Sequence, residues 1–175
     1  MRRVGEQWKW SYSANEPALD LDMASSGQRA NWSIGYLARA FFELRNSRGY
    51  AQNLTMFVEE PEVHLHPEAQ VAIVRILAIL VNSGFRIVLT THSLACIYTI
   101  NNLLLAKSRL GDEPHDSAPD PLMRLKIEDV AVYAIRDGVP RDIVNRNESF
   151  IEEHDLGDVG AALGAEMNFL LNVEV

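Results

Sequence analysis

A short apolar run followed by two acids is the clearest pattern in the chain. Residues 54–58 (LTMFV) are apolar apart from one threonine, and Glu59, Glu60 and Pro61 follow directly. Such a run, bounded by polar residues, predicts a strand buried on both faces of a parallel sheet. Ligands bind beyond the carboxyl ends of such strands, where one acid can hold a divalent cation and the other can polarise a water molecule. A charged strand end that merely faces solvent is the alternative.

A helix and a second strand follow the acids. Pro67 can open a helix, because its missing amide hydrogen is no loss in the first turn. Residues 71–81 (VAIVRILAILV) give that helix a wide apolar surface, and residues 82–84 (NSG) end it. Residues 87–89 (IVL) predict the next strand. A strand, helix and strand of this length imply a right-handed parallel crossover.

This crossover brings a histidine to the acid pair. His92 follows the second strand, so it should lie at the same sheet edge as Glu59 and Glu60. A lone histidine is more often structural than catalytic. Here its expected location beside two acids favours a functional role.

The N-terminal region predicts strands followed by a helix. Aromatic residues alternate within residues 4–21, which predicts a strand pair with these side chains on one face. An exposed aromatic recognition face is the alternative. Residues 30–44 have apolar positions spaced 4, 3, 4 and 3, which predicts a helix that packs on the sheet and ends at residues 46–49. The alternating aromatic residues are Trp8, Trp10 and Tyr12.

Four residues before that helix form a candidate anion site. Ser25 or Ser26 can cap the helix, and Gly27 lets the backbone approach a ligand closely. Together with Gln28 they place hydroxyls and free amides at a helix N-terminus, which readily binds anions. A plain capped helix is the alternative.

The remaining sequence predicts a third helix, a loop and a hairpin. The helix covers residues 94–108, and the proline-rich, acidic residues 111–121 predict a solvated, disordered loop. Residues 127–135 alternate weakly as a strand, and residues 137–138 (DG) are a strong hairpin turn. A return strand and short helical pieces are expected at residues 141–146 and 148–175.

Composition limits the classes of protein. The 175 residues fit one domain with a sizeable core, and 47% hydrophobic and 23% charged residues are ordinary globular values. The net charge of −8 argues against a broad basic surface for nucleic acid. The single cysteine, Cys96, cannot form an internal disulfide, which favours a reducing cytoplasm and a core position for this residue. No signal peptide or membrane span is predicted.

Three motifs resemble those of a known family. Residues 24–29 (ASSGQR) resemble the ABC signature, residues 59–67 (EEPEVHLHP) the Walker B and D-loop segment, and residues 89–93 (LTTHS) the switch-histidine loop. Together they are similar to the ABC-type ATPase heads of the OLD, RecF-like and SMC-like group of AAA ATP-binding proteins. The resemblance covers residues 22–105.

The resemblance implies ATP and Mg²⁺ as cofactors and a role for each motif. Glu59 would help to coordinate Mg²⁺ through water, Glu60 would orient and deprotonate the attacking water, and His92 would contact the γ-phosphate. A homo- or heterodimer through the signature and D-loop faces is also implied. The signature residues would close over the ATP held by a second subunit, and they are Ser25, Ser26, Gly27 and Gln28.

The phosphate-binding loop of this family, GxxxxGK[ST], does not occur in the sequence, and no Gly-Lys pair is present. In the family this loop holds the β- and γ-phosphates. We therefore expect a single α/β domain over residues 1–175, equivalent to the C-terminal half of an ABC-type head. Its mostly parallel core sheet would be flanked by helices, with a hairpin and helices at residues 122–175 and no N-terminal Walker A lobe. ATP hydrolysis would need that lobe from another chain or from a missing N-terminal segment.

Other functions stay open from sequence alone. A head without a phosphate loop could be a non-catalytic dimerisation or regulatory module. A metal-dependent nuclease is a third class. Glu62, His64 and His66 alternate and could chelate zinc if this segment were extended. Cytoplasmic location, no membrane insertion, and a DNA-processing or phage-defence partner are further expectations.

Overall fold

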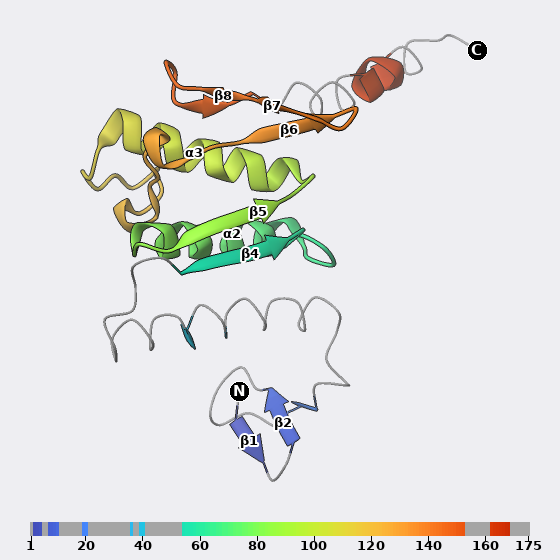
Figure 1. Ribbon diagram of the computed structural model, residues 1–175, viewed down its shortest axis with the longest axis vertical. Coiled ribbons are helices and arrows are strands. Elements are labelled where there is room, and N and C mark those ends of the chain that lie inside the picture. The colour runs from blue at the N-terminus through green and yellow to red at the C-terminus, as the bar shows by residue number, and fades with distance from the viewer. Residues whose placement is uncertain are drawn as a thin grey trace.

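The computed structural model describes residues 2–4, 7–10, 19–20, 36, 39–40, 54–152 and 162–168. Its centre is a parallel pair of strands, β4 (Thr55–Glu59) and β5 (Arg86–Thr90), connected by helix α2 (Pro67–Asn82), as Figure 1 shows. Helix α3 (Leu94–Leu110) follows β5. The predicted order of strand, helix, strand and helix is therefore confirmed.

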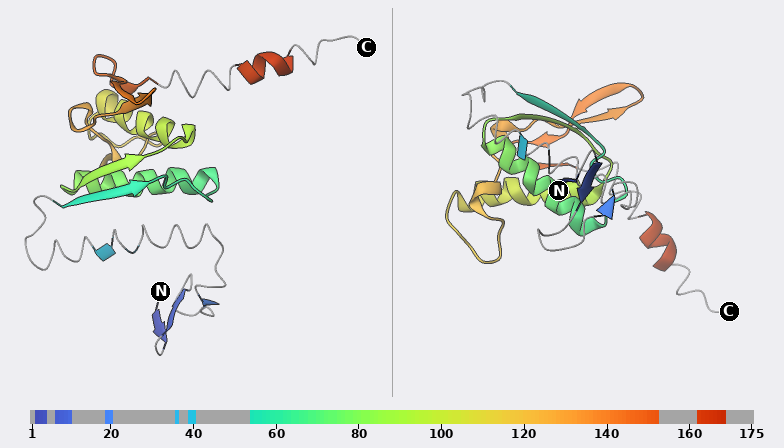
Figure 2. Two further views of the ribbon diagram at one scale, coloured as in Figure 1. Left: turned by 45° about the vertical axis from the view of Figure 1, so that its right-hand side comes forward. Right: turned by 90° about the horizontal axis from the view of Figure 1, so that it is seen from below.

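Helix α2 lies between two apolar clusters. One side of it runs along the β4–β5 pair (Figure 2), and this cluster comprises Met56, Val58, Ile73, Leu77, Leu80 and Phe85. Its other side packs on α3 through a second cluster, which comprises Val74, Ala78, Cys96, Ile97, Leu103, Leu104, Leu125 and Ile151. Each large apolar side chain that is fully buried contributes roughly 1.5–3 kcal/mol to the free energy of folding. The two clusters therefore hold the β4–β5 pair against α2, and α2 against α3. The prediction that α2 is well buried is confirmed.

Strand β4 is buried on one side only. Met56 and Val58 pack against α2, whereas Phe57 between them is 74% exposed. Its partner across the ladder, Val88, is 41% exposed. Alternate residues of a strand face opposite sides, and α2 covers one of these sides. The prediction of a strand buried on both faces is therefore wrong for β4.

The other sheets are antiparallel. β1 (Arg2–Val4), β2 (Gln7–Trp10) and β3 (Leu19–Asp20) form one sheet in that order, which confirms strands within residues 4–21. The protein is thus a mixed α/β fold with a small parallel pair, helices and short antiparallel hairpins. In the part of the chain that the structure describes, the predicted mostly parallel sheet is present only as β4–β5.

The helix predicted at residues 30–44 is described only in part. Tyr36, Arg39 and Ala40 are helical, as expected. Its apolar face, its end at residues 46–49 and the aromatic face of residues 4–21 lie outside the described residues. Among those described, no helix has the length and apolar character needed to cross a membrane.

Helix α3 has a stabilising residue at each end. Ser93 Oγ accepts a hydrogen bond from Cys96 N at 3.3 Å at the start, and Gly111 adopts a left-handed φ of 58° after the last turn. The helix ends at Leu110, two residues beyond the predicted boundary at 108.

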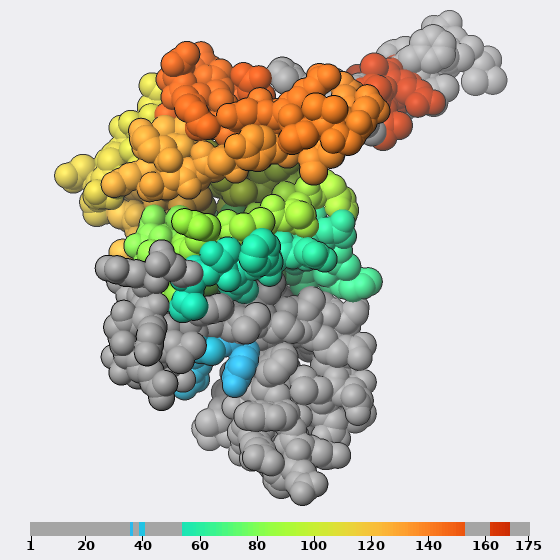
Figure 3. Space-filling view, viewed as in Figure 1, coloured from blue at the N-terminus to red at the C-terminus, as the bar shows by residue number. Residues whose placement is uncertain are grey.

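The C-terminal elements differ from the prediction in their boundaries. The strand expected from residue 127 begins at Tyr133, because a 3-10 turn at residues 127–129 bonds Asp129 N to Lys126 O at 3.1 Å. Asp137 and Gly138, with φ of 53° and 76°, form the predicted hairpin turn. The hairpin lies on the outside of the molecule, beyond α3 (Figure 3). The elements are η2 (Pro121–Met123), η3 (Ile127–Asp129), β6 (Tyr133–Arg136), β7 (Val139–Asp142), β8 (Val144–Asn145) and β9 (Phe150–Ile151).

The last strand is fixed by a buried amide. Asn101 on α3 accepts from Ile151 N at 2.7 Å and donates to Ile151 O at 3.0 Å. β9 pairs with β8, so the return strand expected at residues 141–146 is divided between β7 and β8. The helical prediction for residues 148–175 is wrong at β9 and is confirmed at residues 162–168.

The acidic loop after α3 is held by a buried arginine. Arg124 is 2% exposed, and its guanidinium donates to the carbonyls of Gly111, Glu113 and Pro119 at 2.9, 2.8 and 2.9 Å. The loop is mostly exposed, as predicted. The prediction of disorder is wrong, because these three bonds anchor the loop along its length.

Candidate functional site

The two acids lie where β4 turns away from the sheet. Glu59 is the last residue of β4 and pairs with Thr90 on β5. Glu60 N donates to Thr90 O at 2.9 Å, so the ladder continues one residue beyond the strand. Glu60 then adopts a φ of 40°, a left-handed conformation that costs a non-glycine residue roughly 1–2 kcal/mol. The turn closes when Val63 N donates to Glu60 O at 3.0 Å.

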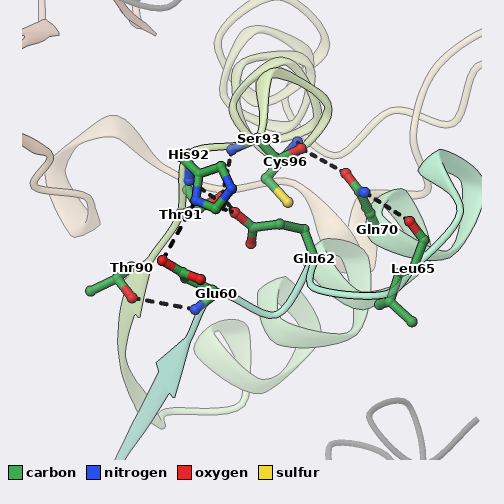
Figure 4. Close-up of polar contacts among 9 residues, drawn as sticks. All are labelled: Glu60, Glu62, Leu65, Gln70, Thr90, Thr91, His92, Ser93 and Cys96. Carbon is green, nitrogen blue, oxygen red and sulfur yellow. Dashed lines mark hydrogen bonds and ion pairs between the residues drawn. The ribbon is translucent and has the colours of Figure 1, made fainter. Parts of the chain in front are cut away.

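This turn places Glu60 beside His92. Glu60 Oε1 lies 3.6 Å from His92 Nδ1, and the two side chains are 53% and 67% exposed. They face one another from the ends of neighbouring parallel strands (Figure 4). The predicted meeting of the acid pair and the histidine at one sheet edge is therefore confirmed. Both groups are open to a ligand from solvent.

An open hollow of about 440 Å³ lies at this edge. Glu59, Glu60, Val63 and Thr90 line it. Its charged lining is acidic, and no lysine or arginine is among these four residues, so the hollow does not attract a bare phosphate. It suits a phosphate that arrives with a cation.

The carboxylates at the hollow could bind Mg²⁺ only together with waters and substrate phosphates, because they do not form a complete ligand set by themselves. Among the described residues, no group of three or more His, Cys, Asp and Glu could hold a metal ion. His64 and His66 are exposed, and the zinc alternative has no such ligand group within the described residues. Mg²⁺ is usually bound by one or two carboxylates together with waters and substrate phosphates. Glu59 at the hollow fits that requirement.

Glu62 connects the turn after β4 (residues 60–63, the acid turn) to the loop after β5 (residues 91–93, the histidine loop). It is only 6% exposed, although it lies in a turn between two exposed acids and two exposed histidines. Its Oε1 accepts from Thr91 Oγ1 at 2.7 Å and from His92 N at 2.9 Å. Sequence reasoning considered Glu62 only as a zinc ligand and missed this contact.

A second link joins the start of α2 to the start of α3. Ser93 Oγ donates to Gln70 Oε1 at 2.6 Å, and Gln70 Nε2 donates to Leu65 O at 3.0 Å. Sequence reasoning missed Gln70 as well. The only local signal was Ser93, which directly precedes an apolar helix and is therefore a natural N-cap.

Cys96 is part of the packing under the site. It is fully buried and packs in the cluster between α2 and α3. Burial raises the pKa of its thiol above the usual 9.0, and hydrogen bonds with Thr91 and Ser93 oppose this shift only in part. The thiol is therefore protonated at neutral pH, as the prediction of a core residue requires.

The signature residues are not placed. Ser25, Ser26, Gly27 and Gln28 lie outside the described residues. Their predicted role in closing over a nucleotide stays a prediction.

Comparisons with known proteins show which family the chain belongs to. The family model for the AAA ATPase domain matches residues 5–97, which include the acid turn and His92. The chain is also similar to the Old nuclease of Escherichia phage P2, with 34% identity over 81 residues. That match covers 45% of this chain and 14% of the phage protein, so the chain spans about a seventh of that relative. No solved structure gives a significant match. Since the family match extends over more than half of its 175 residues, this chain belongs to the AAA ATPase domain family.

Proposed function

We propose that this chain supplies the hydrolytic half of a Mg-ATP site in an OLD/RecF-like ABC ATPase. A Walker A lobe, from another chain or from a segment outside this sequence, completes the site. The approach of Glu60 Oε1 to His92 Nδ1, at 3.6 Å, carries this proposal. It unites the two catalytic groups that ATP hydrolysis by such a head requires.

The residues divide the chemistry between them. Glu59 would hold Mg²⁺, and Mg²⁺, when bound, would neutralise charge on the transferred phosphate. Glu60 orients the attacking water and accepts its proton, and His92 contacts the γ-phosphate. The exposure of both side chains leaves room for a water molecule and a phosphate between them. Ser25, Ser26, Gly27 and Gln28 would close over the nucleotide of a second subunit.

Half of this site gives almost no catalysis. Phosphoryl transfer depends on positioning and on stabilisation of charge, and the hollow of this chain has an acidic lining without a lysine or arginine to hold a phosphate. A dimer through the signature and D-loop faces, or a pairing with a subunit that bears a Walker A loop, is therefore part of the proposal.

A non-catalytic role is the second candidate. The observation that favours it is the absence of any Gly-Lys pair in the 175 residues. Such a chain could dimerise with an intact ATPase and regulate it. Nuclease activity is named for the phage relative, but the match covers 14% of that protein, and we do not extend the activity to this chain.

Reconstitution separates the two candidates. A Walker A lobe from a related ATPase head is purified alone and together with this chain, and release of phosphate from Mg-ATP is measured. We expect hydrolysis only in the mixture. An assembly that forms without hydrolysis, or that changes only the rate of an already active partner, favours the regulatory role.

A further inference from the structure

Glu62 is a buried acid, and both hydrogen bonds that its side chain accepts come from the histidine loop. Its Oε1 accepts from Thr91 Oγ1 at 2.7 Å and from His92 N at 2.9 Å, and it lies 3.6 Å from His92 Nδ1 (Figure 4). Its Oε2 is buried and has no hydrogen-bond partner among the described residues. No other side chain joins the turn after β4 to both Thr91 and His92 in the described part of the chain.

We propose that Glu62 is a positioning residue that holds His92 beside Glu60. The inference rests on the proposed function for its catalytic consequence, and it adds a residue that does not touch the nucleotide. The His92 ring lies between two carboxylates, 3.6 Å from Glu60 Oε1 and 3.6 Å from Glu62 Oε1. The backbone amide of His92 also donates a hydrogen bond to Glu62, and not to Glu60.

The direction of the bonds shows how one acid fixes the loop. Thr91 Oγ1 accepts from Ser93 N at 3.1 Å, and its single proton points to Glu62 Oε1. The amide of His92 points to the same oxygen. Hydrogen bonds to a carboxylate are shorter and stronger than those between neutral groups. One oxygen therefore sets the position of two consecutive residues of the loop.

A purely structural role explains Glu62 poorly. Burial of a carboxylate is costly unless its oxygens are paired, and Oε2 is not. An apolar side chain would fill the same space without that cost. The fold also has a separate link at this point, because Gln70 and Ser93 fix the start of α3 independently of Glu62. The acid adds hydrogen bonds from Thr91 Oγ1 and from the His92 amide, which the Gln70–Ser93 side-chain bond does not supply.

The test compares Glu62→Ala, Glu62→Gln and Thr91→Val with Glu128→Gln, an exposed acid on η3, as the control. Glutamine keeps an acceptor at Oε1, alanine keeps none, and valine removes the hydroxyl donor at nearly constant shape. The first readout is NMR on the 175-residue chain without nucleotide. We expect the His92 amide to exchange with solvent about tenfold faster or more in Glu62→Ala, because loss of a hydrogen bond to a charged group is worth at least a factor of ten, and to exchange at an intermediate rate in Glu62→Gln, which keeps a neutral acceptor.

The second readout is kinetics of the reconstituted assembly. Loss of a residue that orients a catalytic group typically lowers activity about 10–100-fold. We expect kcat to fall by that factor in Glu62→Ala while KM for ATP changes less than about threefold, since Glu62 is buried away from the nucleotide. Glu62→Gln should recover most of the rate, and Glu128→Gln should match wild type.

The outcomes are separable. If the wild-type assembly does not hydrolyse ATP, the proposed function fails and the NMR readout still decides the role of Glu62. If hydrolysis is present and Glu62→Ala keeps both its His92 protection and its kcat, the inference is overturned alone. If Glu62→Ala does not fold, Glu62→Met, which keeps the length of the side chain but has no carboxylate acceptor for His92 N, takes its place: unchanged His92 exchange together with unchanged kcat in Glu62→Met contradicts the proposal.

Discussion

Glu60 and His92 approach within 3.6 Å although a complete helix separates them in the chain. The parallel pairing of β4 and β5 and the left-handed turn at Glu60 produce this approach. The Glu62 carboxylate accepts a hydrogen bond from the backbone amide of His92 and so fixes the position of the histidine loop. The backbone pairing and the turn thus bring the two side chains together, and the hydrogen bond to Glu62 then holds the histidine loop in place.

The isolated chain should bind Mg-ATP weakly or not at all. The lining of the hollow is acidic, and the sequence contains no phosphate-binding loop. Isothermal titration calorimetry of the purified chain with Mg-ATP measures this directly. Low-micromolar affinity of the monomer would contradict the half-site account.

Replacement of Asn101 by leucine should destabilise the fold by about 2–4 kcal/mol. The substitution leaves the N–H and C=O of the buried Ile151 unpaired, and each such group costs about 1–3 kcal/mol. Urea unfolding followed by circular dichroism gives the change. Asn102→Leu, at an exposed neighbouring position on the same helix, is the control and should stay within about 0.5 kcal/mol of wild type.

Replacement of Arg124 by methionine should release the loop at residues 111–120. Methionine fills part of the space but cannot donate to the carbonyls of Gly111, Glu113 and Pro119. We expect cleavage in this loop by an acid-specific protease to become at least about tenfold faster, since open loops are the preferred sites of nicking. Arg75→Met, on the exposed side of α2, controls for loss of a positive charge. Equal cleavage of the two variants would show that Arg124 does not hold the loop.

The sequence predicts the parts of this molecule that depend on local patterns. The apolar run before Glu59, Pro67 at the start of α2 and the Asp137-Gly138 turn each carry their own signal, and each is confirmed. The crossover rule predicts that Glu60 and His92 share one sheet edge, whereas the left-handed turn at Glu60 carries no signal in the sequence. The distant partners of Glu62 and Arg124 carry no local signal. A glutamate between exposed charges is expected to be solvated, and the partners that its side chain finds, Thr91 and His92, lie about thirty residues later in the chain.

Stability should fall as the pH rises above about 9. Burial raises the pKa of the Cys96 thiol in the folded state above its usual 9.0. The folded protein therefore keeps this proton at a pH where the unfolded chain has lost it, and the stabilisation present below pH 9 is lost progressively above it. Urea unfolding between pH 7 and 10 should show this slope in wild type and a smaller slope in Cys96→Ala. If the two proteins lose stability equally with rising pH, groups other than Cys96 cause the pH dependence.

Glu60→Gln in the reconstituted assembly tests the central claim most directly. Glutamine keeps the shape of the side chain but cannot accept a proton from water, and loss of a general base lowers a rate about 10²–10⁴-fold. Binding of ATP should remain, because a negative charge near the γ-phosphate is removed. We predict that hydrolysis of Mg-ATP falls by at least about 100-fold and that gel filtration with ATP shows a stable larger species, which wild type loses as it hydrolyses the nucleotide. Glu68→Gln, an exposed acid on α2, should behave as wild type. Near wild-type turnover by Glu60→Gln, in an assembly shown to be active, would contradict the assignment of Glu60 as the base.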